Sequence, residues 1–265
     1  MSILENLFRM DQRVVVINGG AGRIGSQMCL AVADAGAKVV VLDLDAERAT
    51  EVANDVKKQT GGTAIGIAAD STDQASLDSA LAMTKEKLGA PWGLVNATQY
   101  RGKGFYGSDP ADHPVDAWEQ VFKVNVTGVL IACQTFGRAM IENGGGSIVN
   151  LSSTYGVVSA DPRIYGDSGV NSPISYAGSK SAILNMTRYL AIHWREKNIR
   201  VNTLVPGGVF DNQGEEFVKN YSARTPLGRM AKAEEYQGAA LFMLSDASSY
   251  MTGATVTVDG GWTAW

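Results

Sequence analysis

The stretch RVVVINGGAGRIG, residues 13–25, decides the fold of this chain. It opens with the β-branched run 13–17, which is typical of a strand buried on both faces of a sheet. Glycines follow at positions 19, 20, 22 and 25, and the spacing of apolar side chains predicts a helix over residues 23–35. A glycine-rich turn between strand and helix lets the backbone approach a phosphate at the helix N-terminus. Such turns also use glycine without any ligand, so the turn alone establishes a strand–turn–helix unit and no more.

The remainder of the chain continues the same alternation. Strands are predicted over residues 13–17, 38–42, 63–69, 92–97, 147–151, 199–204 and 254–258. Helices are predicted over residues 23–35, 73–88, 116–141, 175–194 and 233–245, with a sixth capped by Asp45. This alternation predicts one α/β domain, residues 1–265, with a seven-stranded parallel sheet and helices on both faces. Three longer segments, 98–115, 152–174 and 206–232, all follow strands, so we expect them at the carboxyl edge, where ligands bind such sheets.

Composition excludes several classes of protein. The chain has 265 residues, a net charge of −4, two cysteines and two histidines. Cys29 and Cys133 offer no disulfide or zinc spacing, and we expect two buried thiols in a reducing compartment. His113 and His193 stand alone, so no metal site is expected. Mild acidity without a basic block argues against a nucleic-acid partner, and no signal or membrane-spanning segment is recognisable, which predicts a cytoplasmic protein.

Two aspartates follow predicted strands in the N-terminal half of the chain. Asp43 ends the second strand, where a carboxylate can accept hydrogen bonds from an adenosine ribose. The same charge would repel a 2′-phosphate, so Asp43 favours NAD over NADP. Asp70 follows the third strand and is consistent either with a contact to an adenine edge or with a helix cap.

A tyrosine and a lysine lie four residues apart on one predicted helix. Tyr176 and Lys180 share a helix face, and the helix follows the strand that ends at Ser152 and Ser153. Asn125 lies in the helix before that strand. By itself the pair is equally consistent with a tyrosine in the core and a lysine on the surface. The residues around the pair must therefore decide whether it is catalytic.

Taken together, these pieces resemble a short-chain dehydrogenase/reductase from end to end. The resemblance rests on the glycine turn, Asp70, Asn96-Ala97, Asn125, Ser153, Tyr176-x-x-x-Lys180, Pro206-Gly207, and the ending Met251-Thr252-Gly253 to Asp259-Gly260-Gly261. It implies a Rossmann-type, doubly wound sheet, a nicotinamide cofactor, and hydride transfer between an alcohol and a carbonyl.

The resemblance also implies catalytic roles. Tyr176 serves as the acid/base, although an unperturbed phenol, with a pKa of about 10, is a poor base near neutrality. The Lys180 ammonium and the positive nicotinamide ring would lower that pKa, and Lys180 would also bind the nicotinamide ribose. Ser153, with Ser152 as its adjacent rival, orients the substrate oxygen, and Asn125 holds a water in a proton relay.

NAD is the expected cofactor, with NADP the less favoured alternative. Two motifs depart from the family pattern. Arg23 replaces the middle glycine and Asn18 the threonine of the glycine turn, and 96–99 read Asn-Ala-Thr-Gln in place of Asn-Asn-Ala-Gly. Arg23 is consistent with a contact to a cofactor phosphate or with a side chain in solvent. The expected cofactor-binding residues are Asn18, Gly19, Gly22, Arg23, Ile24, Gly25, Asp43, Asp70, Ser71, Asn96, Ala97, Thr98, Tyr176, Lys180, Pro206, Gly207 and Val209.

The three long segments mix rings, carboxylates and amides, which favours a polyhydroxylated substrate over a steroid or acyl chain. Basic side chains there could hold a carboxylate, sulfonate or phosphate, or could simply be solvated. The stretches 171–176 and 260–265 are similar to family members acting on sugars, so a sugar, sugar acid or sulfosugar is expected. The candidate substrate residues are Arg101, Lys103, Tyr155, Arg163 and Phe210, with further loop rings at Tyr100, Phe105, Tyr106, Tyr165 and Phe217.

Alternative functions remain open at this stage. One is reduction of an acyl or other ketone, and another is a non-catalytic dinucleotide-binding sensor, although neither Tyr176 nor Lys180 has been lost. An extended-type dehydratase or epimerase would need a larger C-terminal region. The resemblance further implies a homotetramer, or else a homodimer, built through the helices near Asp116 and Ser175 and the C-terminal strand, with Trp262 and Trp265 apolar enough to bury at the interface.

Overall fold

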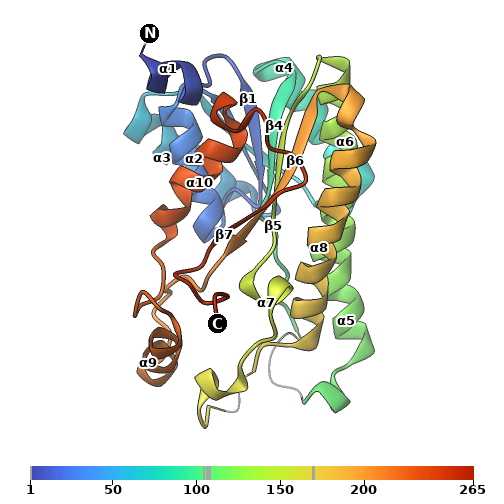
Figure 1. Ribbon diagram of the computed structural model, residues 1–265. Coiled ribbons are helices and arrows are strands. Elements are labelled where there is room, and N and C mark those ends of the chain that lie inside the picture. The colour runs from blue at the N-terminus through green and yellow to red at the C-terminus, as the bar shows by residue number, and fades with distance from the viewer. Residues whose placement is uncertain (1, 104, 106–108, 169–170) are drawn as a thin grey trace.

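The computed structural model describes residues 2–103, 105, 109–168 and 171–265. Its centre is a parallel sheet of seven strands in the order β3-β2-β1-β4-β5-β6-β7, with helices on both faces (Figure 1). All seven predicted strands are confirmed to within two residues at either end. The strands are β1 (Val14–Asn18), β2 (Lys38–Asp43), β3 (Ala64–Ala68), β4 (Pro91–Asn96), β5 (Gly146–Leu151), β6 (Ile199–Pro206) and β7 (Thr255–Val258).

Ten α-helices lie among the described residues. They form two layers because successive side chains of β1 point to opposite faces of the sheet. Val15 and Ile17 join a core with α2, α3 and α10, whereas Val14 and Val16 join a second core with α4, α6 and α8. Both faces of the strand are therefore buried under helices. The helices are α1 (Ile3–Phe8), α2 (Arg23–Asp34), α3 (Ala46–Thr60), α4 (Gln74–Lys87), α5 (Val115–Phe122), α6 (Val129–Glu142), α7 (Thr154–Val157), α8 (Ile174–His193), α9 (Glu215–Arg224) and α10 (Gln237–Leu244).

The predicted helix 116–141 is interrupted. A π-helical segment, Lys123–Gly128, joins α5 to α6 and widens the helix around Asn125. The stretch Val115–Glu142 is apolar and long enough to cross a membrane by composition, but 56% of that apolar window is buried inside the fold. It is a core helix of a soluble fold.

Sequence patterns missed three helices, α1, α7 and α9, while the predicted cap of α3 by Asp45 is confirmed. Helix α9 occupies part of the 206–232 segment. The expectation of buried thiols is also confirmed, because Cys29 and Cys133 are both fully buried in the core, and burial raises the pKa of Cys133 to about 12.

A third, smaller core joins the long segments at the carboxyl edge. It contains Ile164, Tyr221 of α9, Met230 and Trp262, and the Trp262 ring stacks on Tyr221 at a centroid distance of 4.3 Å. Trp262 is only 2% exposed. The predicted interface role of Trp262 is therefore wrong, because its ring is buried within its own chain, whereas Trp265 remains largely exposed.

Candidate active site

The predicted site residues gather at one edge of the sheet. Asn18, Asp43, Asn96 and Pro206 are the last residues of β1, β2, β4 and β6. The strand order reverses between β1 and β4, since the chain proceeds outward from β1 through β2 on one side and from β4 through β5 on the other. Ligands of open α/β sheets bind in the crevice outside such a switch point.

The glycine turn has the shape that a pyrophosphate requires. Gly19 has a φ of +81°, and a Cβ on Gly25 would overlap the Gly19 carbonyl oxygen. Gly22 precedes α2 and provides no side-chain cap, so the N-terminal amides of α2 are available to an anion. The turn therefore fits a dinucleotide phosphate.

Asp43 lies beside this turn. Its carboxylate accepts a hydrogen bond from the Ala21 amide at 3.0 Å, and Arg48 of α3 donates to the Ala21 carbonyl at 3.2 Å. A carboxylate at the end of β2 is suited to accept hydrogen bonds from an adenosine ribose. Asp70 accepts from the Thr72 amide and hydroxyl, both at 2.8 Å. The cap of α4 is Asp73, so the helix-cap alternative for Asp70 is wrong, and its contact with an adenine edge stays a prediction.

A ladder of buried asparagines underlies the crevice. Asn18, Asn96 and Asn150 are paired in register across β1, β4 and β5, and their side-chain amides are linked at 3.0 and 2.9 Å. Ser71 donates to Asn18 at one end, and Asn150 donates to Thr187 of α8 at the other. Because buried amides must be satisfied, this ladder fixes the strand ends on which the site is built.

Sequence reasoning missed two members of this ladder, Asn150 and Thr187. Neither belongs to a local motif, and each is recognisable only once the strand register aligns Asn18, Asn96 and Asn150. The ladder also accounts for the departure at Asn18, because its amide both donates to Asn96 and accepts from Ser71.

The segment after β4 carries a further group suited to a bound dinucleotide. Ala97 donates its amide proton to the Asn18 carbonyl at 2.8 Å, which holds the segment against the glycine turn. The buried Thr98 hydroxyl has no hydrogen-bond partner among the described residues. After β6, Gly207 donates to the Val258 carbonyl, and Val209 pairs with Ala231.

The remaining expected cofactor residues open α2. Ile24 and Gly25 lie in its first turn, directly after Arg23. Arg23 forms an ion pair with Asp211 and donates to the Phe210 carbonyl at 2.9 Å. Neither interpretation made from the sequence, a phosphate contact or a solvated side chain, anticipated this partner.

Tyr176 and Lys180 lie on the first turns of α8, where the helix meets the end of β5. The Lys180 Nζ atom lies 5.9 Å from the centroid of the Tyr176 ring. Lys180 is 4% exposed and donates to the Leu151 carbonyl at 3.1 Å. Burial, and to a lesser degree the positive charge of Arg101, lowers the pKa of Lys180 to about 8.

Asn125 faces the same helix from the π-helical segment. Its side-chain amide donates to the Ser179 hydroxyl at 3.1 Å, and its carbonyl oxygen accepts from the Tyr100 amide at 2.8 Å. Ser179 in turn donates to the Tyr176 carbonyl. The widened turn thus attaches Asn125 to the helix that carries the tyrosine and the lysine.

The geometry distinguishes the two adjacent serines after β5. Ser152 donates its hydroxyl proton to the Lys180 carbonyl at 2.7 Å, so it secures α8. Ser153 caps α7 by accepting from the Tyr155 amide at 3.2 Å, a bond that leaves its own hydroxyl proton available. This difference favours Ser153 for a contact with a substrate oxygen.

Aromatic rings surround Tyr176. Phe105 and Tyr155 meet its ring edge-on at centroid distances of 5.8 and 6.4 Å. Tyr155 also contacts Trp262 edge-on at 6.4 Å, which connects the catalytic helix to the third core. Burial raises the pKa of Tyr155, and it raises that of Tyr221 to about 12, so both phenols are neutral near pH 7.

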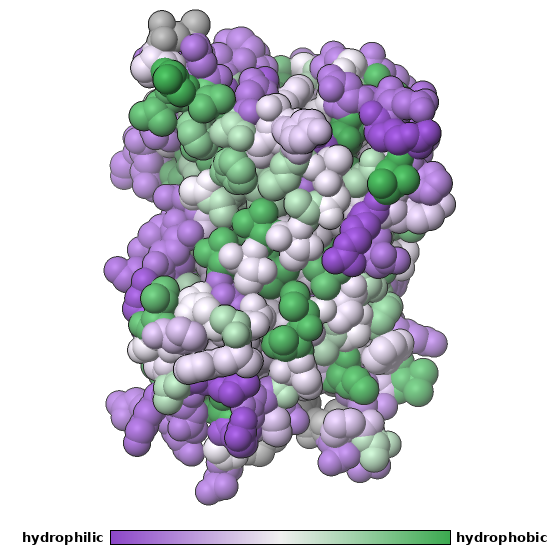
Figure 2. Space-filling view, viewed as in Figure 1, coloured by the Kyte–Doolittle hydropathy of each residue, from purple (hydrophilic) through white to green (hydrophobic). Residues whose placement is uncertain are grey.

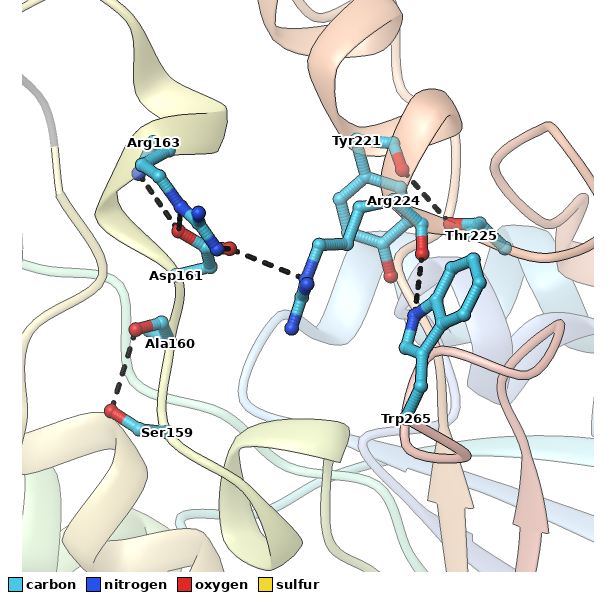
Figure 3. Close-up of polar contacts among 8 residues, drawn as sticks. All are labelled: Ser159, Ala160, Asp161, Arg163, Tyr221, Arg224, Thr225 and Trp265. Carbon is cyan, nitrogen blue, oxygen red and sulfur yellow. Dashed lines mark hydrogen bonds and ion pairs between the residues drawn. The ribbon is translucent and has the colours of Figure 1, made fainter.

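The basic side chains predicted to bind the substrate differ in whether they already have a partner in the structure. The Arg163 guanidinium pairs with Asp161, and Arg224 of α9 reaches the same carboxylate at 3.2 Å (Figure 3). These residues border a hollow of about 300 Å³ at the outer side of the third core. The Asp161 pKa is lowered to about 2, mainly by its hydrogen bonds to Arg163. The Arg163 side chain is therefore already paired.

The other substrate candidates lie nearer the catalytic helix or remain exposed. Arg101 is exposed and acts electrostatically on Lys180. Lys103 is exposed, and its carbonyl accepts from the Tyr100 hydroxyl. Phe210 is 46% exposed, and its carbonyl is bound to Arg23. Tyr106 lies outside the described residues, among which no cluster of metal-binding side chains is found.

Comparisons with known proteins identify the family of this chain. A family model described as enoyl-(acyl carrier protein) reductase matches residues 19–263. The chain is 35% identical over 268 residues to the galactitol 2-dehydrogenase (L-tagatose-forming) of Cereibacter sphaeroides, with 98% of this chain and 99% of that protein covered. It is 36% identical over 275 residues to the galactitol 2-dehydrogenase of Rhizobium johnstonii, and 33% identical over 271 residues to the 2-(S)-hydroxypropyl-CoM dehydrogenase 3 of Xanthobacter autotrophicus. The alignment with the Rhizobium protein covers 98% of this chain and 99% of that protein. The alignment with the Xanthobacter protein covers 97% of this chain and 98% of that protein.

Solved structures with a similar fold indicate the same kind of enzyme. A short-chain type dehydrogenase/reductase from Mycobacterium marinum superposes with a TM-score of 0.89 at 30% identity, over 100% of both chains. A gluconate 5-dehydrogenase from Burkholderia cenocepacia, in complex with NADP and tartrate, superposes with a TM-score of 0.87 at 28% identity, over 98% of this chain and 99% of that one. The fold and site thus define an NAD(P)-dependent dehydrogenase acting on CH–OH groups. The chain belongs to the short-chain dehydrogenase/reductase family.

Proposed function

We propose that this enzyme interconverts a secondary or hemiacetal alcohol of a polyol, sugar or sugar acid and the corresponding carbonyl or lactone, with NAD as its cofactor. The observation that carries the proposal is the arrangement of Tyr176, the buried Lys180, Asn125 and Ser153 at the carboxyl edge of the sheet. When bound in the crevice, the nicotinamide accepts or supplies the hydride.

The chain's own residues handle the proton. Ser153 orients the substrate oxygen through its hydroxyl, and Tyr176 takes the alcohol proton during oxidation or returns it during reduction. The Lys180 ammonium, close to the Tyr176 ring, stabilises the phenolate that proton transfer creates. Asn125, fixed to α8 through Ser179, is positioned to hold a water that continues the relay.

A polyol or sugar substrate is supported by the lining of the site and by the relatives. Tyr155, which is half-buried beside Tyr176, offers a ring for sugar C–H groups, and Arg101 offers a cation for a sugar acid or sulfosugar. Two of the relatives above are galactitol dehydrogenases by name. The reductase alternative retains support from the description of the family model, and one relative acts on a different kind of alcohol.

The proposed preference for NAD over NADP is supported by the charges of the side chains beside the glycine turn. Asp43 carries a carboxylate where a 2′-phosphate would lie, and Arg23 is engaged by Asp211. One structural neighbour is in complex with NADP, so both dinucleotides belong in the assay.

The purified protein should reduce NAD with galactitol, other polyols, aldoses, sugar acids or sulfosugars in a panel followed by NADH absorbance. Turnover confined to acyl or steroid substrates would contradict the proposed substrate class. Tyr176→Phe should abolish turnover while dinucleotide binding, measured by fluorescence, persists. Tyr250→Phe, which replaces an exposed tyrosine outside the proposed site, is the matched control.

We also propose a homotetramer located in the cytoplasm, with a homodimer as the alternative assembly. Figure 2 shows apolar side chains gathered along the middle of the face that β7 crosses. Tyr189 and Ile192 of α8 are each 62% exposed. Two separate apolar surfaces are what a dimer of dimers requires.

A further inference from the structure

The turn after Val209 is a compact unit that a long-range ion pair joins to the start of α2. Phe210 donates to the Ala231 carbonyl, which anchors the start of the turn beside β6. Within the turn, the Gln213 side chain accepts from the Asp211 amide at 2.7 Å and donates to the Val209 carbonyl at 2.9 Å. Asn212 has a φ of +54°, which reverses the chain. These local bonds define the shape of the turn but do not attach it to α2.

Arg23 makes that attachment. It is the first residue of α2, and its guanidinium holds both the Asp211 carboxylate and the Phe210 carbonyl. The ion pair joins residues 188 positions apart in the sequence. It therefore connects the helix that follows β1 with the turn that follows β6, from opposite sides of the switch point between β1 and β4.

The charge of Arg23 is unusual at this position. The N-terminus of a helix carries the positive end of the helix dipole, so a cation in the first turn is unfavourable unless a nearby anion offsets it. Asp211 supplies that anion. In return, Arg23 neutralises a carboxylate that would otherwise stand near the phosphate-binding end of α2 and repel a dinucleotide.

We propose that the Arg23–Asp211 ion pair is a latch, which holds the turn 209–213 across the dinucleotide crevice and slows release of the bound cofactor. Arg23 is then a positioning residue: it acts through Asp211 and does not bind the pyrophosphate. The inference rests on the proposed use of a nicotinamide dinucleotide by this site.

The test uses a variant that removes the latch without changing the net charge. In Arg23→Gln/Asp211→Asn, the electrostatic environment of the pyrophosphate keeps its net charge while the attachment is lost. Exposed ion pairs contribute about 0.2–1 kcal/mol, so NADH should leave the double variant up to about fivefold faster than the wild type. Release is measured by stopped-flow fluorescence, with excess NAD displacing NADH, and is repeated with NADPH and NADP.

A second readout needs no cofactor. Backbone amides of residues 209–215 should exchange hydrogen faster in the double variant and in each single variant than in the wild type. Asp246→Asn is the matched control, since it removes an Asp–Arg pair with Arg13, at the opposite edge of the sheet. It should change neither cofactor release nor exchange in residues 209–215.

The outcomes are distinguishable. The latch is overturned if Arg23→Gln weakens binding while Asp211→Asn tightens it, because Arg23 would then hold the pyrophosphate directly. It is also overturned if release and exchange in the double variant match the wild type. A wild-type protein that binds neither NADH nor NADPH would overturn the proposed function itself, and the latch with it.

Discussion

Lys180 occupies a position that a stable core would give to an apolar residue. It is 4% exposed, it donates a hydrogen bond to the Leu151 carbonyl, and its charge is desolvated beside Tyr176. A buried ammonium whose principal role is to stabilise a phenolate imposes a free-energy cost on the fold. Function and stability therefore oppose each other at this residue.

Replacing Lys180 by Met should stabilise the cofactor-free protein while abolishing turnover. Because burial lowers the Lys180 pKa from 10.5 to about 8, the unfolded chain binds more protons between these values. The free energy of unfolding of the wild type should therefore rise with pH through this window, and Lys180→Met should lack that rise. We expect the variant to be more stable by about 2 kcal/mol at pH 7, with the difference shrinking towards pH 10.

Urea denaturation across this pH range measures the effect. Lys58→Met, which replaces an exposed lysine of α3, should show no such pH dependence. A constant difference between wild type and Lys180→Met at every pH would contradict the burial cost assigned to the ammonium.

Asp43 should determine the choice between dinucleotides. Asp43→Asn keeps oxygen and amide groups for the ribose but removes the charge that opposes a 2′-phosphate. Arg48, which donates to the carbonyl of the same residue, Ala21, then becomes a neighbouring cation without a competing carboxylate. We expect the ratio of kcat/KM for NADP to that for NAD to rise about tenfold, equivalent to about 1.4 kcal/mol.

Steady-state kinetics with both cofactors test this preference. Adding Arg48→Gln to Asp43→Asn should reverse most of the gain with NADP. An unchanged ratio in Asp43→Asn would show that the carboxylate does not face the ribose.

At the scale of elements, strands were more predictable than the helices that cover the site. Short apolar runs identify all seven strands. Five of the strands, β1, β2, β4, β5 and β6, are buried along most of their length, whereas the edge strands β3 and β7 are partly exposed. Helix α9 was missed because its apolar residues Phe217 and Tyr221 pack against distant segments, at Tyr165 and Trp262. Local periodicity carries little information about a short helix stabilised by such contacts.

The site shows the same division between local and long-range information. Tyr176 and Lys180 are recognisable because their spacing is local to one helix. The π-helical widening at Asn125 and the partners of Arg23 and Arg163 depend on contacts between segments far apart in sequence. Sequence reasoning could therefore name these residues without determining what they bind.

The Asp161 carboxylate should hold the second long segment against α9. Its side chain is 9% exposed and bridges Arg163 and Arg224, so Asp161→Asn would leave two guanidinium groups facing each other. We expect a loss of roughly 1–3 kcal/mol in the free energy of unfolding and a higher KM for substrate, because the segment includes Tyr155. Since the Asp161 pKa is lowered from 3.8 to about 2, its contribution should be complete above about pH 5 and be lost as the pH falls through 2.

Arg163→Gln is the matched control for Asp161→Asn. The Arg163 side chain is 80% exposed, so its replacement should cost much less stability than the replacement of Asp161. Thermal and urea unfolding at pH 7 compare the two variants. Equal costs would show that Arg163, and not the bridge from Asp161 to Arg224, secures the segment.

At the scale of the whole molecule, the catalytic helix also presents an apolar surface to the outside. Helix α8 buries Ile183 and Leu190 in the second core and carries Tyr176 and Lys180 at its start. Its outer side exposes Tyr189 and Ile192, and the Tyr189 ring stacks on His193 at 4.0 Å. A partner packed on this side would hold the helix on which the acid/base pair is mounted.

Ile192→Glu should therefore disrupt assembly and reduce turnover together. A charge placed in an apolar interface is desolvated without a partner, which costs several kcal/mol per site and is incurred by both partners across a two-fold axis. We expect light scattering after size-exclusion chromatography to show a tetramer for the wild type and a smaller species for the variant. Leu4→Glu, which charges the exposed apolar helix α1, should leave the assembly intact. If Ile192→Glu remains a fully active tetramer, then α8 does not form the interface, and the apolar face crossed by β7 would have to account for the assembly.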